Sequence, residues 1–313
     1  MYDLLKAIAA KQGDALRMIP IERLTDLRQD IADFQNEQDL NGFQQYIVDH
    51  LYQLEPPATD FSIRSIIIIA SPTPAYAKVN IVWQGKKIPM RCLAPSAPGK
   101  QAAAIATVQY LTQLLQPTPY RIHAAPRLPR KRLAVRSGLA AYGRNNICYI
   151  EGMGSFFTLT TYFTDIPCPE DHWHDLRVMA NCRHCLACQA NCPTGAISQT
   201  RFLIDNERCL SYFNERPDAF PDWLPKSIHH CLYDCLMCQI GCPQNQDRIN
   251  QVIGPIEFDK DETTLLLSGK PFAAFPPALQ TKVQLLGMDQ WLGAIPRNLK
   301  VLIENNEQGF ALR

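Results

Sequence analysis

The chain has 313 residues, of which 46% are hydrophobic, so it can form one large domain or two smaller ones with real cores. Its net charge of +1 argues against bulk attraction to nucleic acid or to an anionic membrane. The N-terminus has no basic region followed by an apolar stretch, and the most apolar run, 66–70, is far too short to span a bilayer. Twelve cysteines without a signal peptide therefore predict metal binding in a reducing compartment, the cytoplasm, rather than disulfides.

The first third of the chain alternates between helical and strand patterns. Residues 1 to about 55 have apolar residues at helical spacing and are expected to be helical. The short, β-branched run 65–70 predicts a buried central strand. The runs 79–83 and 86–91 flank Gln84-Gly85, which favours a hairpin. A helix is expected over about 100–116, with one apolar face formed by Ala104, Val108 and Leu111.

Residues 117–137 are rich in proline and positive charge, and a loop is expected there. The charged residues are Arg121, Arg127, Arg130, Lys131, Arg132 and Arg136. Such a loop is usually a solvated face, but it could also clamp an anionic cofactor tail or a substrate phosphate.

A strand-like run at 147–150 precedes Gly152-Met153-Gly154-Ser155, and a second apolar run then continues to Phe163. Two glycines beside a small polar residue allow a ligand to approach the backbone closely, although glycine pairs also mark plain turns.

Two cysteine runs dominate the region 180–245. The first has C-x2-C-x2-C-x3-C-P spacing and the second has C-x2-C-x3-C-P spacing, which is the pattern of bacterial two-cluster ferredoxins. In that pattern the last cysteine of each run binds the other cluster, and a proline suits the first turn of the helix that follows. Zinc or disulfide sites rarely need so many thiolates with a proline behind the last. The sequence therefore predicts two 4Fe–4S clusters.

The crossing rule assigns seven of the eight ligands. The first cluster takes Cys182, Cys185, Cys188 and Cys242. The second takes Cys192, Cys235, Cys238 and one further cysteine. Cys209 and Cys231 are both candidates, and Cys209 is preferred because three residues rather than two separate Cys231 from Cys235. The other cysteines are expected to be free and buried, namely Cys92, Cys148, Cys168 and Cys231.

With these residues identified, the chain resembles the epoxyqueuosine reductase family, relatives of the corrinoid reductive dehalogenases, over about 60–305. The similarity rests on segments 137–145, 154–157, 182–197, 208–212, 235–243 and 296–300. The family's second cluster takes a cysteine in an Arg-Cys-x-Ser-Tyr context, which supports Cys209.

The resemblance implies an α/β (α+β) cobalamin-binding domain followed by a two-cluster ferredoxin-like domain. We expect a cobalamin and substrate domain at 1–175, a cluster domain at 176–250 and a helical tail at 251–313 that packs back on the core. The residues expected to contact cobalamin are Arg144, Asn146, Cys148, Gly154, Ser155, Phe156, Leu159 and Ser211.

One departure from the family concerns the proton donor. The family has an aspartate in an Asp-x-Ala-Pro context, whereas residues 123–126 read His-Ala-Ala-Pro. His123 can donate a proton near neutral pH, and Tyr142 and Tyr149 are competing donors with a higher unperturbed pKa. Many members also extend into C-terminal helical repeats that help to hold tRNA, whereas this chain stops at Arg313. Both departures predict a substrate other than epoxyqueuosine in tRNA.

The resulting prediction is a cobalamin-dependent reductase that receives electrons from a low-potential donor such as ferredoxin or flavodoxin. Its substrate would be a small molecule or a modified nucleoside, with tRNA as a further candidate partner and no membrane involved. Two alternatives are an electron-transfer protein that reduces a partner's corrinoid and an enzyme similar to reductive dehalogenases.

Overall fold

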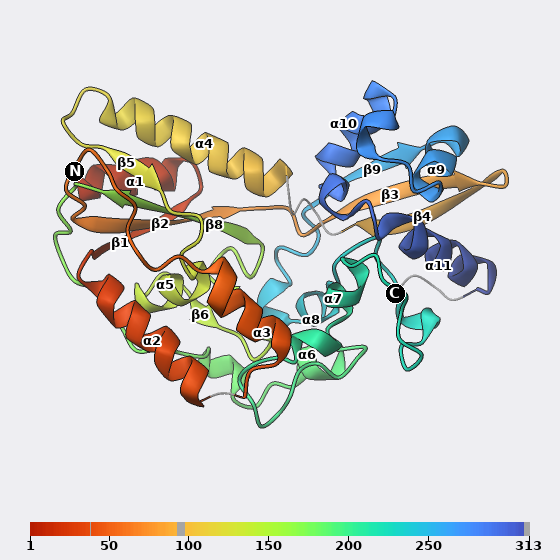
Figure 1. Ribbon diagram of the computed structural model, residues 1–313, viewed down its shortest axis with the longest axis horizontal. Helices are drawn as coiled ribbons and strands as arrows, with labels where there is room; N and C mark the ends of the chain where they lie inside the picture. Colours follow the sequence, from red (N-terminus) through yellow and green to blue (C-terminus); the bar gives the residue numbers. More distant parts are fainter. Residues whose placement is uncertain (38, 93–97, 310–313) are drawn as a thin grey trace. The chain divides into compact units, whose positions relative to one another are not determined.

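The computed structural model describes residues 1–37, 39–92 and 98–309, which fall into two compact units (Figure 1). Unit 1 comprises 1–72 and 102–185, and unit 2 comprises 73–101 and 186–313. This division differs from the three consecutive domains that the sequence predicts. The reason is that the hairpin within 73–101 pairs with a strand from the C-terminal part of the chain.

Unit 1 is built on a four-stranded sheet in the order β1-β2-β8-β5, in which all neighbours are antiparallel. The strands are β1 (Ala15–Pro20), β2 (Ser65–Pro72), β8 (Phe157–Thr164) and β5 (Ile122–Ala124). The predicted central strand is confirmed, since β2 lies between two others and the run 66–69 is fully buried. A strand covered on both faces shows no polar alternation, and the isoleucine run follows this rule.

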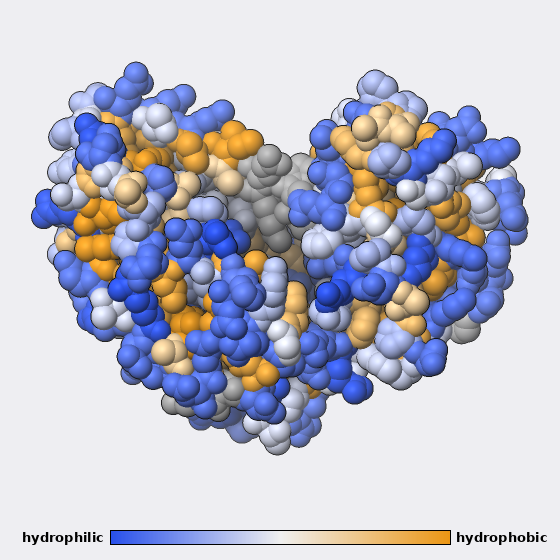
Figure 2. Space-filling view, in the orientation of Figure 1, coloured by the Kyte–Doolittle hydropathy of each residue, from blue (hydrophilic) through white to orange (hydrophobic). Residues whose placement is uncertain are grey.

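The helices of unit 1 surround this sheet. They are α1 (Tyr2–Lys11), α2 (Arg23–Glu37), α3 (Gly42–Tyr46) with the π-helix η1 (Ile47–Leu51), most of α4 (Pro98–Leu115) and α5 (Arg130–Arg136). Side chains from α1, α4 and three strands form one apolar core, which includes Leu5, Met18, Ile67, Leu111 and Tyr162. The outer surface of α2 is hydrophilic, as Figure 2 shows.

Three sequence expectations for unit 1 need correction. The helical pattern of 1–55 is interrupted by β1, which pairs with β2 residue by residue. The loop expected at 117–137 contains β5 and α5, because Leu133, Ala134 and Val135 bury one side of a short helix. On α4 the predicted apolar face is rotated, since Val108 is 39% exposed whereas Thr107 and Leu111 are buried.

Unit 2 contains a three-stranded sheet in the order β4-β3-β9. Its strands are β3 (Tyr76–Trp83), β4 (Lys86–Cys92) and β9 (Val252–Phe258). The predicted hairpin is confirmed, because Trp83 pairs with Lys86 and both turn residues have left-handed backbone, Gln84 with φ 49° and Gly85 with φ 77°. β9 runs parallel to β3, so the C-terminal tail is not purely helical.

Helices complete unit 2 and carry the cysteines. The longer helices are α9 (Lys260–Leu267), α10 (Pro277–Leu285) and α11 (Ile295–Glu307), and α11 confirms the helix expected near the C-terminus. Short helices in the cluster region are α6 (Ala187–Ala190), η3 (Asn206–Arg208), α7 (Leu210–Asn214), η4 (Lys226–Ile228), α8 (Met237–Ile240) and η5 (Pro243–Asn245). Two further 3-10 turns are η6 (Phe272–Ala274) and η7 (Met288–Trp291). Among the helices in the described ranges, none combines the length and the apolar character needed to cross a membrane.

Candidate iron–sulfur and cofactor site

The two cysteine runs each contain one short helix, and these helices, α6 and α8, pack on each other within unit 2. Gly241, which directly precedes Cys242, lies at this contact. A Cβ at position 241 would come within 2.4 Å of Nδ2 of Asn191, the residue before Cys192. The Asn191 amide is held in place, because it donates to the Ala187 carbonyl at 2.8 Å. The missing side chain at 241 therefore allows the two runs to approach each other at their last cysteines.

Four of the predicted ligands lie near one another in unit 2. The Cys209 thiol is close enough to Cys192 for their charges to interact, and Cys235 has the same relation to Cys209 and Cys238. Burial raises the pKa of both Cys209 and Cys235, so without metal these thiols stay protonated at neutral pH. Iron binding would deprotonate them, and this donor set fits an iron–sulfur cluster.

Cys231, the competing candidate, is fully buried, and burial raises its pKa to about 12. Its backbone forms a parallel bridge with Arg91 of β4, and the neighbouring Leu232 N–H donates to the Arg91 carbonyl at 3.0 Å. Both candidates thus lie near Cys235, and Cys209 also lies near Cys192. All twelve cysteines are free of disulfides.

In the part of the chain that the structure describes, no group of three or more His, Cys, Asp or Glu side chains is arranged to hold a single metal ion. The ligands of a 4Fe–4S cluster need no such convergence, because each thiolate binds a different iron atom.

The first cysteine run begins in unit 1, beside the segment expected to contact cobalamin. Strand β6 (Ala141–Tyr142) pairs with β7 (Cys148–Tyr149) and also holds the chain that leads to Cys182. The Met179 N–H donates to the Tyr142 carbonyl at 2.8 Å, and the Arg144 guanidinium donates to the Cys182 carbonyl at 2.9 Å. The 3-10 turn η2 (Ala180–Cys182) is thereby attached to the predicted cofactor segment.

Helix α5 connects the two predicted cobalamin segments of unit 1. Lys131 donates to the Asn146 carbonyl at 3.0 Å, and Arg130 donates to the Leu159 carbonyl at 2.9 Å. The Ile150 N–H donates to the Gly154 carbonyl at 2.9 Å, which closes the hairpin between the segments. All six cations of 117–137 bond to protein atoms, so each of them supports the local fold.

Several features of these segments fit a bound corrin. Nε of Arg144 is buried and has no hydrogen-bond partner among the described residues, so it can donate to an acceptor on a ligand, such as an amide oxygen of a corrin side arm. Gly154 has φ 60° and Asn146 has φ 58°, both in the left-handed region. Ser155, Phe156 and Leu159 are buried.

Two other predicted contacts have their side chains engaged within the protein. The Cys148 thiol donates to the Lys131 carbonyl at 3.6 Å, and burial raises its pKa to about 12. In unit 2 the Ser211 hydroxyl donates to Asp234 Oδ1 at 2.5 Å. Any contact of these residues with cobalamin would therefore compete with protein hydrogen bonds.

The three candidate proton donors differ in environment, and Tyr149, which is 5% exposed, accepts a hydrogen bond from Asn145 Nδ2 at 2.9 Å. His123 is exposed on β5 and lines a small pocket of about 80 Å³ together with Glu55, Arg127 and Phe163. Tyr142 is only 7% exposed, and burial raises its pKa well above the usual range, with the charge of a nearby Cys148 thiolate as a smaller cause. A phenol in that environment gives up its proton less readily than one in water. Sequence reasoning missed Glu55 in this pocket, because nothing in its local pattern marks it.

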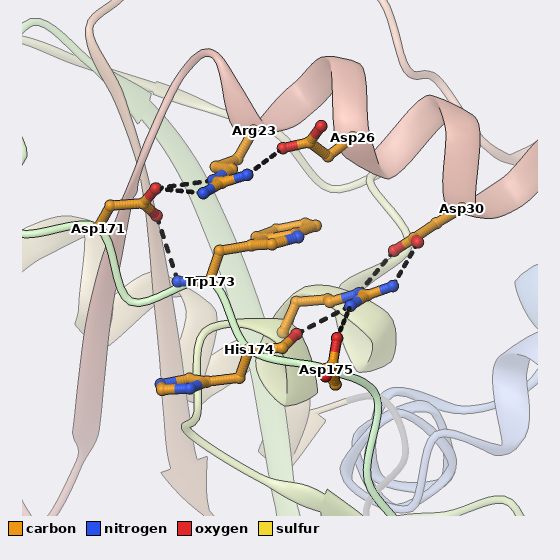
Figure 3. Close-up of polar contacts among 8 residues, drawn as sticks. Arg23, Asp26, Asp30, Asp171, Trp173, His174 and Asp175 are labelled. Atoms are coloured by element: carbon orange, nitrogen blue, oxygen red, sulfur yellow. Dashed lines mark hydrogen bonds and ion pairs between the residues drawn. The ribbon is translucent and has the colours of Figure 1, made fainter.

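A cluster of charged and aromatic side chains fastens the segment before the first cysteine run to α2 (Figure 3). Trp173 is flanked by two guanidinium groups, with Arg23 5.6 Å and Arg136 5.4 Å from the ring centre. Arg23 also pairs with Asp171 at 2.5 Å, and Arg136 pairs with Asp30 of α2. We call this cluster the Trp173 clasp, and sequence reasoning missed it because its members are far apart along the chain.

A mixed α/β fold that carries a domain for two 4Fe–4S clusters defines the class of protein. Residues 181–245 match the family model described as a 4Fe-4S double cluster binding domain. The particular relatives found are epoxyqueuosine reductases. The chain is 36% identical to that of Escherichia coli K12 over 126 residues, covering 40% of this chain and 32% of the relative. It is 32% identical to that of Aliivibrio fischeri over 205 residues, covering 61% of this chain and 50% of the relative.

Solved structures show the same fold. Epoxyqueuosine reductase from Streptococcus thermophilus superposes with a TM-score of 0.62 at 16% identity, over 98% of this chain and 81% of that chain. An epoxyqueuosine reductase with an epoxyqueuosine-modified tRNA-Tyr stem loop gives a TM-score of 0.63 at 18% identity, over 96% and 80%. The sequence matches to the two curated relatives span only a third to a half of their lengths, 32% and 50%. The predicted resemblance to the epoxyqueuosine reductases is confirmed, and so is the predicted fold class.

Proposed function

We propose that the chain is a cytoplasmic oxidoreductase that uses two 4Fe–4S clusters and cobalamin to reduce a substrate. The observation that carries the proposal is the hydrogen bond from Arg144 to the Cys182 carbonyl at 2.9 Å. It joins the segment expected to contact cobalamin to the first cysteine of the first run. The match of 181–245 to a double-cluster domain supports the clusters.

We assign the ligands as the sequence predicts. The first cluster takes Cys182, Cys185, Cys188 and Cys242, and the second takes Cys192, Cys209, Cys235 and Cys238. The proximity of Cys209 to both Cys192 and Cys235 supports Cys209 as the eighth ligand. A low-potential ferredoxin or flavodoxin is the proposed electron donor.

Cobalamin would be held by the segments 144–148 and 154–159, with Ser211 as a further contact. When bound, it would supply a strongly reducing cobalt centre. The chain's own part is to bind and orient the cobalamin. Arg144 Nε supplies a buried hydrogen-bond donor without a partner among the described residues. Gly154 leaves the backbone without a side chain just before strand β8 begins. Lys131 and Arg130 hold the carbonyls of Asn146 and Leu159 in place from α5.

His123 is the proposed proton donor to the reduced substrate, because it is exposed in a pocket and a histidine donates readily near neutral pH. A positioned acid is typically worth about 10²–10⁴-fold in rate. The proposed substrate is a small molecule or a modified nucleoside other than epoxyqueuosine in tRNA, because the Asp-x-Ala-Pro carboxylate of the family is replaced at His123.

The test is anaerobic purification with cobalamin supplied, followed by removal of free cobalamin and a spectrum. Corrinoid absorption beside the broad iron–sulfur band is expected. Clusters without retained corrinoid, together with reduction of a partner's corrinoid, would instead indicate an electron-transfer protein.

The loaded protein is then assayed with epoxyqueuosine in tRNA, as wild type and as the His123→Asp and His123→Ala variants. We expect no turnover by the wild type. If the wild type and His123→Ala both reduce epoxyqueuosine in tRNA at the same rate, the substrate is shared with the family and His123 is not the acid.

A further inference from the structure

The motif Pro296-Arg297-Asn298 begins helix α11, far in sequence from every cysteine, yet it lies against the cluster region within unit 2. Asn298 is 1% exposed, and its side-chain amide has both hydrogens engaged. Nδ2 donates to the Asn214 carbonyl at 2.7 Å and to the Leu232 carbonyl at 2.7 Å. One side chain therefore joins two backbone segments.

These two segments carry ligands of the second cluster. Asn214 is the last residue of α7, the helix that begins directly after Cys209, and Leu232 lies three residues before Cys235. The spacing between the segments that hold these two cysteines therefore depends on the amide of Asn298.

The same two segments are joined by a second set of hydrogen bonds. Asn214 Nδ2 donates to the Asp234 carbonyl at 2.8 Å, and the Ser211 hydroxyl donates to Asp234 Oδ1 at 2.5 Å. Asp234 Oδ1 also accepts from the Cys235 N–H at 2.7 Å, so this carboxylate orients a predicted ligand directly. Asp234 has left-handed backbone, with φ 61°, which fixes the turn that leads into Cys235.

The orientation of Asn298 is itself determined. Arg297 donates to Asn298 Oδ1 from Nη2 at 2.8 Å and from Nε at 3.1 Å. The same guanidinium donates to the Phe213 carbonyl at 2.6 Å and lies over the ring of Phe220, 3.7 Å from its centre. With Oδ1 engaged by Arg297, the NH₂ group must face the two carbonyls.

We infer that Asn298 is a positioning residue for the second 4Fe–4S cluster: it fixes the segment of Cys209 against the segment of Cys235. Loss of the amide would leave two buried carbonyls without their donor and let the two segments separate. The cluster would then be lost more readily, although no ligand is removed. This inference rests on the proposed ligation of the second cluster by Cys209 and Cys235.

The chain offers a matched control on the same helix. Asn305 is 3% exposed, and its Nδ2 likewise donates to two carbonyls, those of Lys226 at 2.8 Å and His229 at 3.3 Å. That amide holds η4 and the residue after it, which carry no predicted ligand. A general weakening of α11 would affect both variants alike, whereas a positioning role belongs to Asn298 alone.

The experiment compares the wild type, Asn298→Leu and Asn305→Leu as full chains reconstituted anaerobically with iron and sulfide. Iron per chain, the electron paramagnetic resonance spectrum after dithionite reduction and the rate of iron loss to a chelator are measured, with Tm recorded for each. Asn298→Leu is expected to retain about four iron atoms instead of about eight, or to lose the second cluster at least about tenfold faster. The first cluster's signal and both clusters of Asn305→Leu should remain.

Retention of both clusters by Asn298→Leu at the wild-type rate would overturn the inference, as would equal loss from the two variants. Should Asn298→Leu not fold, Asn298→Ser decides by the same criteria, because a serine hydroxyl carries one donor and is too short to serve both carbonyls. Cys209→Ser, measured in parallel, tests the ligand assignment separately. If it keeps both clusters, the assignment and the inference fail together; if it loses one while Asn298→Leu loses none, only the inference fails.

Discussion

Gly241 shows how one missing side chain determines whether two metal-binding runs can meet. The backbone at this position is right-handed helical with φ −77°, so any residue could adopt it, and only the contact with Asn191 requires glycine. Position 241 is therefore selected by packing rather than by backbone conformation.

Gly241→Ala is expected to separate α6 from α8, because the new Cβ would lie 2.4 Å from Asn191 Nδ2. We expect iron per reconstituted chain to fall to about half or less of the wild-type value, measured by colorimetric iron analysis. The double variant with Asn191→Ala removes the obstacle and should recover most of the iron. Wild-type iron in Gly241→Ala alone would contradict this reading of the contact.

His229 is a second residue at which the surroundings matter, because they determine when its imidazole ring is protonated. Its Nδ1 bonds to Asn214 Oδ1 at 3.0 Å, and its ring packs on Phe220. Burial, aided by the charges of Arg297 and His230, lowers its pKa to about 4. The folded protein thus keeps this ring neutral at a pH where the unfolded chain protonates it.

The low pKa of His229 makes the free energy of unfolding depend on pH. Between about pH 6.5 and 4 the unfolded chain binds a proton at His229 that the folded chain does not, so the free energy of unfolding falls as pH falls, by at most about 3 kcal/mol. His229→Gln removes the titration. Urea unfolding at pH 7 and pH 4.5 should show a smaller acid-induced loss in the variant than in the wild type. Equal losses in both proteins would rule out this titration as a source of acid sensitivity.

At the scale of elements, α5 and α2 hold the segments that lead to the predicted cofactor sites. The charged residues of α5 bond to carbonyls of the predicted corrin segments and to Asp30 of α2. The Trp173 clasp then connects α2 and α5 to the chain before Cys182. In these contacts α2 and α5 support the loops to which they bond.

Trp173→Ala is expected to release the segment 170–182, because two guanidinium groups lose the ring that they share. Each cation–π contact is worth about 0.5–2 kcal/mol. Faster hydrogen exchange should be confined to this segment and to the start of α2. Trp173→Phe keeps an aromatic face and should stay close to the wild type; if it exchanges as fast as the alanine variant, the stacking does not hold the segment.

At the scale of the whole molecule, the proposed activity needs the clusters and the cobalamin segments at once. The two sets of residues can be separated by mutation, because the corrin segments lie in unit 1 whereas most cluster ligands lie in unit 2. A defect in one cofactor should therefore leave the other measurable.

Gly154→Val tests this separation. Gly154 has φ 60°, a conformation that a β-branched residue adopts only with strain, so the backbone just before strand β8 should be distorted. Corrinoid retention after desalting is expected to fall at least about tenfold, while the iron content stays at the wild-type level. A variant that binds cobalamin normally would dismiss this segment as part of the pocket.

The sequence by itself determined the features that depend on neighbouring residues. The cysteine spacing identified a double-cluster region, now matched at 181–245, and the isoleucine run identified the central strand β2. Gln84-Gly85 identified a hairpin because the turn that they form needs left-handed backbone at both positions. These signals are local, so no knowledge of the fold was needed to find them.

Only the tertiary structure decided the features that join distant parts of the chain. Asn298 reaches carbonyls 84 and 66 residues away, and Arg136 reaches Asp30 across 106 residues. The sequence pattern predicted a helix at the residues of β1, whereas they form a strand because they pair with β2. The hairpin β3–β4 joined unit 2 because β9, more than 150 residues later, pairs with it. Such contacts depend on where the folded backbone places each residue, and a local sequence pattern does not predict that placement.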